Sequence, residues 1–309
     1  MTIELPHGNE SVAATALPHP RAVLELLKPV TWFPPMWAFG CGVASQPGPV
    51  GARIGVILTG IVLAGPLVCA TSQAVNDWFD RHVDAINEPG RPIPSGRIPG
   101  RWGLVIACGW TLLSLFVAAI IGVWVFVAAA LGLALAWAYS APPLRLKQNG
   151  WFGNSACALC YEGLAWVTGA AVMADGALPD WRIFIIAFLY SAGAHGIMTL
   201  NDFKSVEGDR RMGIGSLPAL LGVERAARVA CIFMAVPQIA VVALLALWGR
   251  PVHAIVVLLA LIAQCVLMPR LLENPRAKAP WYNGTGVTLY VLGMLVSAFA
   301  LRSVLAGGA

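Results

Sequence analysis

Charge is scarce in this sequence: only 11% of its 309 residues are Asp, Glu, Lys or Arg. Soluble domains contain about 25% charged residues. Hydrophobic residues make up 58% of the chain, and its mean hydropathy is +0.75. Such a chain cannot cover a surface that faces water, which excludes a soluble globular protein and indicates the lipid bilayer as its solvent.

Several familiar motifs are also missing. The sequence has neither a Walker loop nor a GxGxxG motif, so nucleotide binding by those routes is not indicated. Its first 20 residues contain no basic segment followed by an apolar core, and we therefore expect no cleaved signal peptide. All seven cysteines lie in apolar stretches. Cys157 and Cys160 form a lone CxxC without a nearby histidine, which favours buried thiols over a metal or redox site.

The apolar stretches lack the strict alternation of a β-barrel and reach about 20 residues, the length of a membrane-spanning helix. We expect an all-α integral membrane protein with a disordered cytoplasmic tail over residues 1–25 and one polytopic domain over 26–303. That domain is predicted to have about nine spans. They are placed near residues 26–46, 53–75, 102–121, 123–141, 153–174, 181–200, 224–248, 251–271 and 283–302.

Basic residues divide unevenly between the segments that connect these spans. One alternating set of segments contains 16 of the 20 Lys and Arg residues, and the other contains only Arg53, Arg182, Arg250 and Arg302. The positive-inside rule then places the N-terminus in the cytoplasm and the C-terminus in the periplasm. We expect the bilayer, and no nucleic acid, as the partner of these surfaces.

Two polar segments on the cytoplasmic side resemble each other. Both begin with Asn-Asp, at Asn76 and at Asn201, which are 125 residues apart. Four predicted spans separate them, so the two segments have the same orientation. The chain is therefore predicted to contain a parallel internal repeat, with motifs at 76–84 and 201–209 on one face of the membrane.

The first motif gathers acidic residues on one helical stripe. If the second span continues as helix past Asn76, then Asn76, Asp80 and Asp84 lie within about 80° of one another. Asp77 lies at the edge of the same stripe. Carboxylates in this arrangement repel one another unless a positive charge lies between them.

The second motif repeats the pattern, because Asp202 and Asp209 stack on one face with Ser205 at its edge. Acidic residues at helix ends can simply be solvated, but a repeated stripe favours Mg²⁺, which binds one or two carboxylates together with water and substrate phosphates. Nearby cations suit phosphate oxygens: Arg81, Arg91, Arg97, Arg145, Lys147, Lys204 and Arg210. The residues alone thus predict a magnesium–diphosphate site in a membrane protein.

At these motifs the sequence resembles the UbiA superfamily of intramembrane prenyltransferases. It is most similar to the branch with the chlorophyll and bacteriochlorophyll synthases, in LKPVTWFPPMWAFGCG (27–42), NDWFDRHVDAINEPGRPIPSGRIPGRWG (76–103), AYSAPPLRLKQNGWFGN (138–154), YEGLAWVTGAAVMA (161–174) and GAHGIMTLNDFKSVEGDRRMGIGSLPALLG (193–222). Many superfamily members have a third acidic residue in the second motif, where this chain has Ser205, and Ser205 resembles the residue of the pigment synthase branch. The resemblance implies a UbiA-type bundle in the inner, intracytoplasmic membrane of a phototrophic bacterium, with its active site on the cytoplasmic side.

The implied reaction transfers a geranylgeranyl or phytyl group from its diphosphate to the C17 propionate of bacteriochlorophyllide a. Mg²⁺ is the implied cofactor, with Mn²⁺ as an alternative, and other pigment-synthesis membrane proteins are the implied partners. Chlorophyllide a as the acceptor, a quinone or haem prenyltransferase, and a transporter are the rival interpretations. A transporter would place its charges near the bilayer midplane, whereas these aspartates gather at one face.

Residue roles follow from the stripes and the resemblance together. We expect Asp80, Asp84, Asp202 and Asp209 to be catalytic and to bind Mg²⁺ together with Asn76 and Asp77, while Asn76, Arg91, Arg145, Lys147, Lys204 and Arg210 bind the diphosphate. Glu162 lies within the fifth span, where an ionised side chain is costly unless it is paired or faces a cavity. It is predicted to line the acceptor pocket with Tyr161 and His195. For His195, packing between helices is favoured over a place in that pocket.

Overall fold

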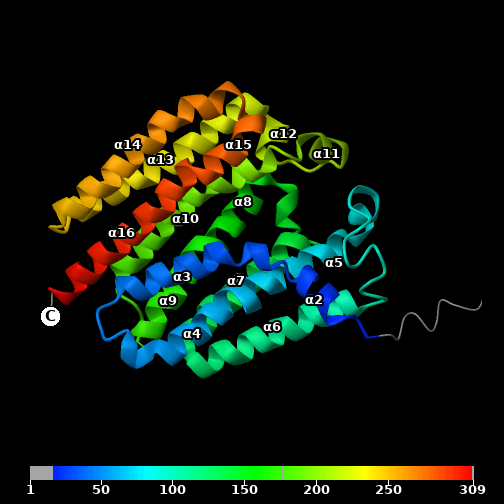
Figure 1. Ribbon diagram of the computed structural model, residues 1–309, viewed down its shortest axis with the longest axis horizontal. Helices are drawn as coiled ribbons and strands as arrows, with labels where there is room; N and C mark the ends of the chain where they lie inside the picture. The colour runs from blue at the N-terminus through cyan, green and yellow to red at the C-terminus, as the bar shows by residue number, and fades with distance from the viewer. Residues whose placement is uncertain (1–16, 176, 308–309) are drawn as a thin grey trace, which may run out of the picture.

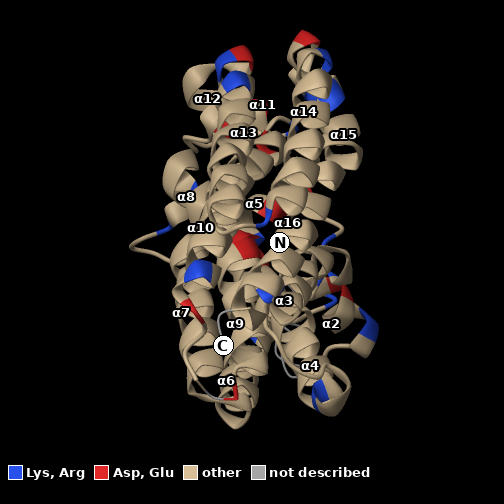
Figure 2. Cartoon of the chain, turned by 90° about the vertical axis from the view of Figure 1, so that its left-hand side faces the viewer, with Lys and Arg blue, Asp and Glu red and all other residues tan. Residues whose placement is uncertain are grey.

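Helices make up the protein in the computed structural model, which describes residues 17–175 and 177–307. The long helices lie side by side and form an elongated bundle (Figure 1). Within the described residues there is no β-strand, and one isolated bridge joins Asn149 to Gly215. The prediction of an all-α protein is therefore confirmed. Most of the chain is uncharged, with Lys, Arg, Asp and Glu confined to short stretches (Figure 2).

Eight helical segments of the described chain are long and apolar enough to cross a membrane. Five of them are single helices: α6 (Trp102–Ile121), α7 (Val123–Ser140), α10 (Trp181–Asp202), α13 (Val223–Leu247) and α14 (Pro251–Glu273). The other three are composite. The composite segments are α4 (Ile54–Val62), η3 (Leu63–Cys69) and α5 (Ala70–Asn87); α8 (Gly150–Ala158), η5 (Leu159–Leu164) and α9 (Ala165–Met173); and α15 (Pro275–Gly284) with α16 (Gly286–Ala306). Short helices α11 (Val206–Arg211) and α12 (Leu217–Leu221) follow α10.

The first predicted span is not a single long helix, so the described residues contain about eight candidate spans where nine were predicted. Residues 26–46 instead contain η1 (Pro29–Thr31) and α3 (Phe33–Ser45). At 13 residues α3 is about 20 Å long, shorter than the roughly 30 Å hydrocarbon core. Three prolines, at positions 29, 34 and 35, explain the interruption, because proline has no N–H to donate and restricts the residue before it.

The N-terminal tail also differs from its prediction. Residues 20–26 form the helix α2 (Pro20–Leu26), where the last part of a disordered tail was expected. The side chain of His19 caps this helix by accepting a hydrogen bond from the backbone N–H of Arg21. Residues 1–16 lie outside the described part of the chain.

Two of the membrane segments contain a π-helical stretch. One is η3, which includes Pro66, and the other is η5, which includes Tyr161 and Glu162. Proline cannot donate the hydrogen bond of a regular helix, which accounts for the widened turn in η3. Cys69 Sγ of η3 lies 3.5 Å from the hydroxyl of Tyr161, so the two irregular segments face each other in the bundle.

The two ends of the bundle differ, and we call the end with the short helices and longer connections the loop-rich end. Helices α2, α11 and α12 gather at one end, and the C-terminus lies at the other (Figure 1). Three of the four basic residues predicted to be periplasmic donate to backbone carbonyls: Arg53 to Val172, Arg250 to Ser303 and Arg302 to Gly48. These hydrogen bonds satisfy backbone carbonyl groups. The orientation of the bundle in the membrane stays a prediction.

Glycines allow α3 to pack closely on α9. A Cβ atom added to Gly42 would lie 2.0 Å from the carbonyl oxygen of Trp166, and one added to Gly169 would lie 2.0 Å from that of Phe39. Such distances leave no room for a side chain. The short helix α3 is therefore fixed in the bundle by backbone contact with α9, and it also packs against α16.

We expect the substitution Gly42→Ala to lower the free energy of unfolding by about 1–3 kcal/mol, because overpacking forces the two helices apart. Gly40 is the matched control, since it lies on the same helix and a Cβ there would meet nothing within 4 Å. Gly40→Ala should leave stability unchanged or raise it slightly, because alanine is the better helix former. Thermal melting of the two purified variants in detergent checks this. Equal melting temperatures would contradict the packing argument.

Candidate active site

The predicted acidic stripe forms on a regular helix, because α5 does continue past Asn76. Asn76 Nδ2 donates to Asp80 Oδ2 at 3.0 Å and lies 3.3 Å from Ser140 Oγ at the end of α7. Lys147 forms an ion pair with Asp80 Oδ1, and Arg145 lies 3.5 Å from the same oxygen. Burial lowers the pKa of Lys147, and its bond to Asp80 opposes that effect. Asp80 therefore binds two cations from the loop after α7.

Arg91 joins the two buried carboxylates of the stripe. It lies 2.8 Å from Asp84 and 3.3 Å from Asp77, and it also pairs with Glu88 at 2.7 Å. The Arg91 guanidinium holds the pKa of Glu88 below its usual value. Lys28, in the turn before α3, lies 2.6 Å from Asp77. Asp77 is thus neutralised by two cations from separate loops, and Arg91 bridges it to Asp84.

The second motif has a different geometry from the one predicted. Helix α10 ends at Asp202 and α11 begins at Val206, so no continuous helix stacks Asp202 over Asp209. Ser205 lies in the break, and its hydroxyl donates to Asp209 Oδ2 at 3.0 Å. Ser216 donates to the same oxygen at 2.6 Å. Asp209 therefore has hydroxyl partners, and Ser205 is one of them.

Asp202 is the carboxylate with the least compensation. Asn154 of α8 donates to Asp202 Oδ2 at 2.9 Å and also lies 3.3 Å from Thr199. Within residues 17–175 and 177–307, no Lys, Arg or His forms an ion pair with Asp202. A cation bound here would therefore meet an unpaired negative charge.

The loops that carry Lys147 and Ser216 interlock. The backbone N–H of Gly215 donates to the carbonyl of Gln148 at 2.9 Å, and that of Gly150 donates to Gly215 at 2.7 Å. A Cβ atom on Gly150 would lie 2.6 Å from the backbone nitrogen of Leu217. The partners of Asp80 and Asp209 are consequently tied together by backbone contacts between the two halves of the chain.

Both motifs lie at the same end of the bundle, as predicted. Asn87, at the end of α5, approaches Met212 after α11, with 3.9 Å between Nδ2 and Sδ. Tyr139 of α7 lies near enough to Asp80 and to Asp202 for both charges to act on its hydroxyl. The two acidic clusters are therefore neighbours across one polar region.

Some predicted ligands lie at the rim of this region. Lys204 and Arg210 are exposed. Glu207 is also exposed and pairs with Arg276 of α15 at 2.8 Å between the charged atoms. None of the three is in contact with the carboxylates of the stripe. A role in binding diphosphate for Lys204 and Arg210 stays a prediction.

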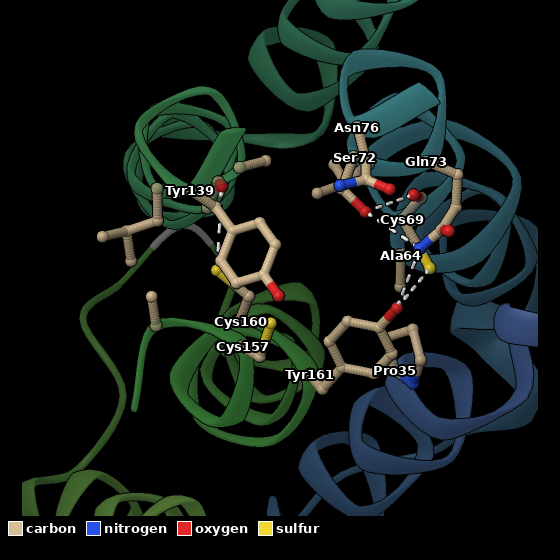
Figure 3. A pocket seen from close by; sticks show the side chains of 15 residues that line it. Pro35, Ala64, Cys69, Ser72, Gln73, Asn76, Tyr139, Cys157, Cys160 and Tyr161 are labelled. Carbon is tan, nitrogen blue, oxygen red and sulfur yellow. Dashed lines mark hydrogen bonds between the residues drawn. The ribbon is translucent and has the colours of Figure 1, made fainter. Parts of the chain in front are cut away.

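A cavity of about 210 Å³ opens beside the acidic stripe. Asn76, Ser72, Gln73 and Cys69 line one wall, and Tyr139, Cys157, Cys160 and Tyr161 line the other (Figure 3). The hydroxyl of Tyr161 points across the cavity, where it accepts from Gln73 Nε2 at 3.2 Å (Figure 3). We call this space the donor-side cavity. It is mainly apolar, and Asn76 connects it to Asp80.

A second cavity of about 430 Å³ lies between α3, η5, α10 and α16. Tyr161 and Cys157 line it as well, so these two side chains separate it from the donor-side cavity. Glu162 lines its wall and is only 4% exposed, and Glu162 Oε2 has no hydrogen-bond partner among the described residues. Asn201 and Asn283 lie at its polar end. We call this space the second cavity.

His195 does not line either cavity, which contradicts its prediction as a pocket residue. Its Nδ1 lies 3.2 Å from Ser155 Oγ, and its ring stacks on Trp151 with 5.7 Å between centroids. The ring centroid of Phe233 of α13 lies 4.5 Å from that of His195. His195 is a packing residue between α8, α10 and α13.

Sequence reasoning missed several polar residues of the site: Lys28, Gln73, Tyr139, Ser140, Asn154 and Ser216. Gln73 had a signal, because it lies one helical turn before Asn76 and Asp77 on the same span. The missed residues from other segments gave no signal in the sequence, because they lie far from the two motifs along the chain and at irregular distances from them.

The donor set fits Mg²⁺, although no three His, Cys, Asp or Glu residues of the described chain come close enough together to bind a metal by themselves. Mg²⁺ binds oxygen ligands and commonly takes only one or two carboxylates, with water and phosphate completing its shell. Asp80 and Asp84 offer oxygen ligands on α5, and Asp202 offers an uncompensated one on α10. A diphosphate-bound metal could therefore bridge the two motifs.

Known proteins share both the sequence and the fold. The chain is 58% identical to the bacteriochlorophyll synthase 33 kDa chain of Cereibacter sphaeroides, over 95% of this chain and 97% of that one. It is 40% identical to the chloroplastic chlorophyll synthase of Oryza sativa subsp. japonica, over 90% of this chain and 76% of that one. The structure of a UbiA homologue from Archaeoglobus fulgidus bound to GPP and Mg²⁺ has a similar fold, with a TM-score of 0.61 and 22% identity over 91% of this chain and 99% of that one.

The likeness to the archaeal structure concerns the fold alone, whereas the sequence match identifies the family. Residues 31–289 match the UbiA prenyltransferase family, a range that includes both acidic motifs. The chain belongs to the UbiA prenyltransferase family.

Proposed function

We propose that this chain transfers a geranylgeranyl or phytyl group from its diphosphate to the C17 propionate of bacteriochlorophyllide a. The names of its relatives at 58% and 56% identity, both bacteriochlorophyll synthase chains, support this substrate. One structural observation is central to the proposal. Asn76 lines the apolar donor-side cavity and also donates to Asp80, so a site for a charged head group adjoins a space for a hydrocarbon chain.

In this proposal Mg²⁺ is held by oxygen ligands from Asn76, Asp80, Asp84, Asp202 and Asp209. When bound, the metal neutralises charge on the diphosphate and so favours departure of that group. Asp77 is left out of the ligand set, because at 1% exposure it is the most enclosed carboxylate of α5 and Lys28 and Arg91 both contact it. Its role is to position Arg91.

The basic residues of the site act on the leaving group. The bond between the prenyl C1 and the diphosphate oxygen breaks, and its electron pair leaves with the diphosphate. Arg91, Arg145 and Lys147 meet the negative charge that develops on the diphosphate oxygens. A carboxylate oxygen of the acceptor then bonds to C1. No proton is transferred, because the propionate is already ionised at neutral pH.

The acceptor macrocycle is assigned to the second cavity. That cavity is the larger of the two and has mainly apolar walls, including Trp37 and Phe33. Tyr161 lines both cavities, and Asn201, the residue before Asp202, lines the polar end of the second one. The reacting ends of the two substrates would therefore meet at that polar end. We further propose that the loop-rich end faces the cytoplasm of a bacterial photosynthetic membrane, as the distribution of basic residues predicts.

Metal dependence is tested by Asp80→Asn, which should lower the rate of ester formation by about 10²–10³, since one ligand and the anchor of Lys147 are lost together. EDTA should abolish the reaction of the wild type, and added Mg²⁺ should restore it. Pigment esterification in purified membranes measures both effects. Glu207→Gln is the matched control: this carboxylate is exposed and pairs with Arg276, so it should retain wild-type activity. Full activity of Asp80→Asn would contradict the proposal.

Lys147→Met should reduce the rate by a similar factor of about 10² and raise the KM for the prenyl diphosphate, because the cation nearest Asp80 is lost. The KM for the pigment should stay unchanged. Arg276→Met removes a positive charge at the rim and is the control. Steady-state kinetics with each substrate varied in turn make the comparison, and a change confined to the pigment KM would argue against the assigned role of Lys147.

Substrate choice is tested by offering geranylgeranyl diphosphate with either pigment. We expect esterified bacteriochlorophyllide a as the main product, measured by chromatography of extracted pigments. Esterified chlorophyllide a alone would move the chain to the activity named for its plant relatives. Absence of ester from both pigments, with a folded protein, would overturn the pigment assignment.

A further inference from the structure

The buried carboxyl of Glu162 has no partner that explains its position. It is 4% exposed, lies in the wall of the second cavity, and its Oε2 atom has no hydrogen-bond partner among the residues described. No Lys, Arg or His of the described chain forms an ion pair with it. A polar group so buried is costly unless a ligand satisfies it.

The surroundings of Glu162 favour its un-ionised form. The cavity wall is largely apolar, with Trp37, Ile197 and Val291 among its residues. An ionised carboxylate without a cation is strongly disfavoured in such a place within the membrane. An un-ionised carboxyl has an O–H group, so it can donate a hydrogen bond as well as accept one.

The second cavity also has an unsatisfied amide at its other end. Asn283 Oδ1 is buried without a hydrogen-bond partner, while Asn283 Nδ2 donates to Asn201 Oδ1 at 3.2 Å. Asn201 precedes Asp202, so this end of the cavity adjoins the metal-binding motif. A large flat ligand with its reactive arm near Asn201 would present another part of its edge to Glu162.

We propose that Glu162, as an un-ionised carboxylic acid, donates a hydrogen bond to a carbonyl group on the edge of the tetrapyrrole acceptor and so helps to select that acceptor. This inference rests on the proposed function. Besides its methyl ester and its propionate carboxylate, bacteriochlorophyllide a offers two carbonyls, the ring ketone and an acetyl group. Chlorophyllide a shares the ketone but has a vinyl group in place of the acetyl group.

The test compares wild type, Glu162→Gln and Glu162→Leu in the purified full-length chain, with both pigments and geranylgeranyl diphosphate. The leucine variant should raise the KM for bacteriochlorophyllide a by roughly 5- to 150-fold, since the ligand carbonyl would be buried without a donor. The glutamine variant retains N–H donors of nearly the same shape and should stay within about threefold of wild type. The KM for geranylgeranyl diphosphate is the internal measure of an intact fold and should not change in either variant.

The two pigments show which carbonyl accepts the hydrogen bond. A penalty in the leucine variant for bacteriochlorophyllide a alone assigns the bond to the acetyl group, and equal penalties for both pigments assign it to the ketone. An unchanged pigment KM in the leucine variant overturns the inference. So does a glutamine variant as impaired as leucine, because that result requires an ionised carboxylate. If the wild type esterifies neither pigment, the proposed function fails instead.

Discussion

Neutralisation of three carboxylates on one helix is the constraint on which the loop-rich end of the bundle depends. Asp77, Asp80 and Asp84 lie within two turns of α5, two of them buried, and each repels the others. Their cations come from other segments, with Arg91 after α5 and Lys147 after α7. The ion pairs thereby hold the segments that follow α5 and α7 against the acidic residues of α5. The same electrostatic need that would draw a metal ion also shapes the loops around these carboxylates.

The sequence was most informative where local physics decides the structure. Apolar runs predicted the long helices, because a bilayer requires every backbone group to be paired within its segment. The stripe on α5 was predicted correctly because one uninterrupted helix determines its geometry. The second motif was not, since α10 ends at Asp202 and the backbone N–H of Ser205 closes a turn onto the carbonyl of Asp202 in place of a continuing helix. Partners such as Lys28 and Asn154, 49 and 48 residues from Asp77 and Asp202, could not be predicted from spacing.

The two π-helical stretches explain how a bundle of packed helices accommodates two cavities. A widened turn redirects the side chains that follow it. In η5 this presents Tyr161 to both cavities and Glu162 to the second one. In η3 it presents Cys69 to the hydroxyl of Tyr161. Irregular backbone in a membrane segment is tolerated where it lines a cavity, which is the position of both stretches.

The backbone contact between residues 148–150 and 215 limits how the two halves of this chain can diverge in evolution. Gly150 cannot accept a side chain while Leu217 stays in place, and Gly215 exchanges hydrogen bonds with both Gln148 and Gly150. A mutation in one loop would therefore be tolerated only with a matching change in the other. The two loops fit only each other, so exchanging one half of the chain between relatives should require moving both loops together.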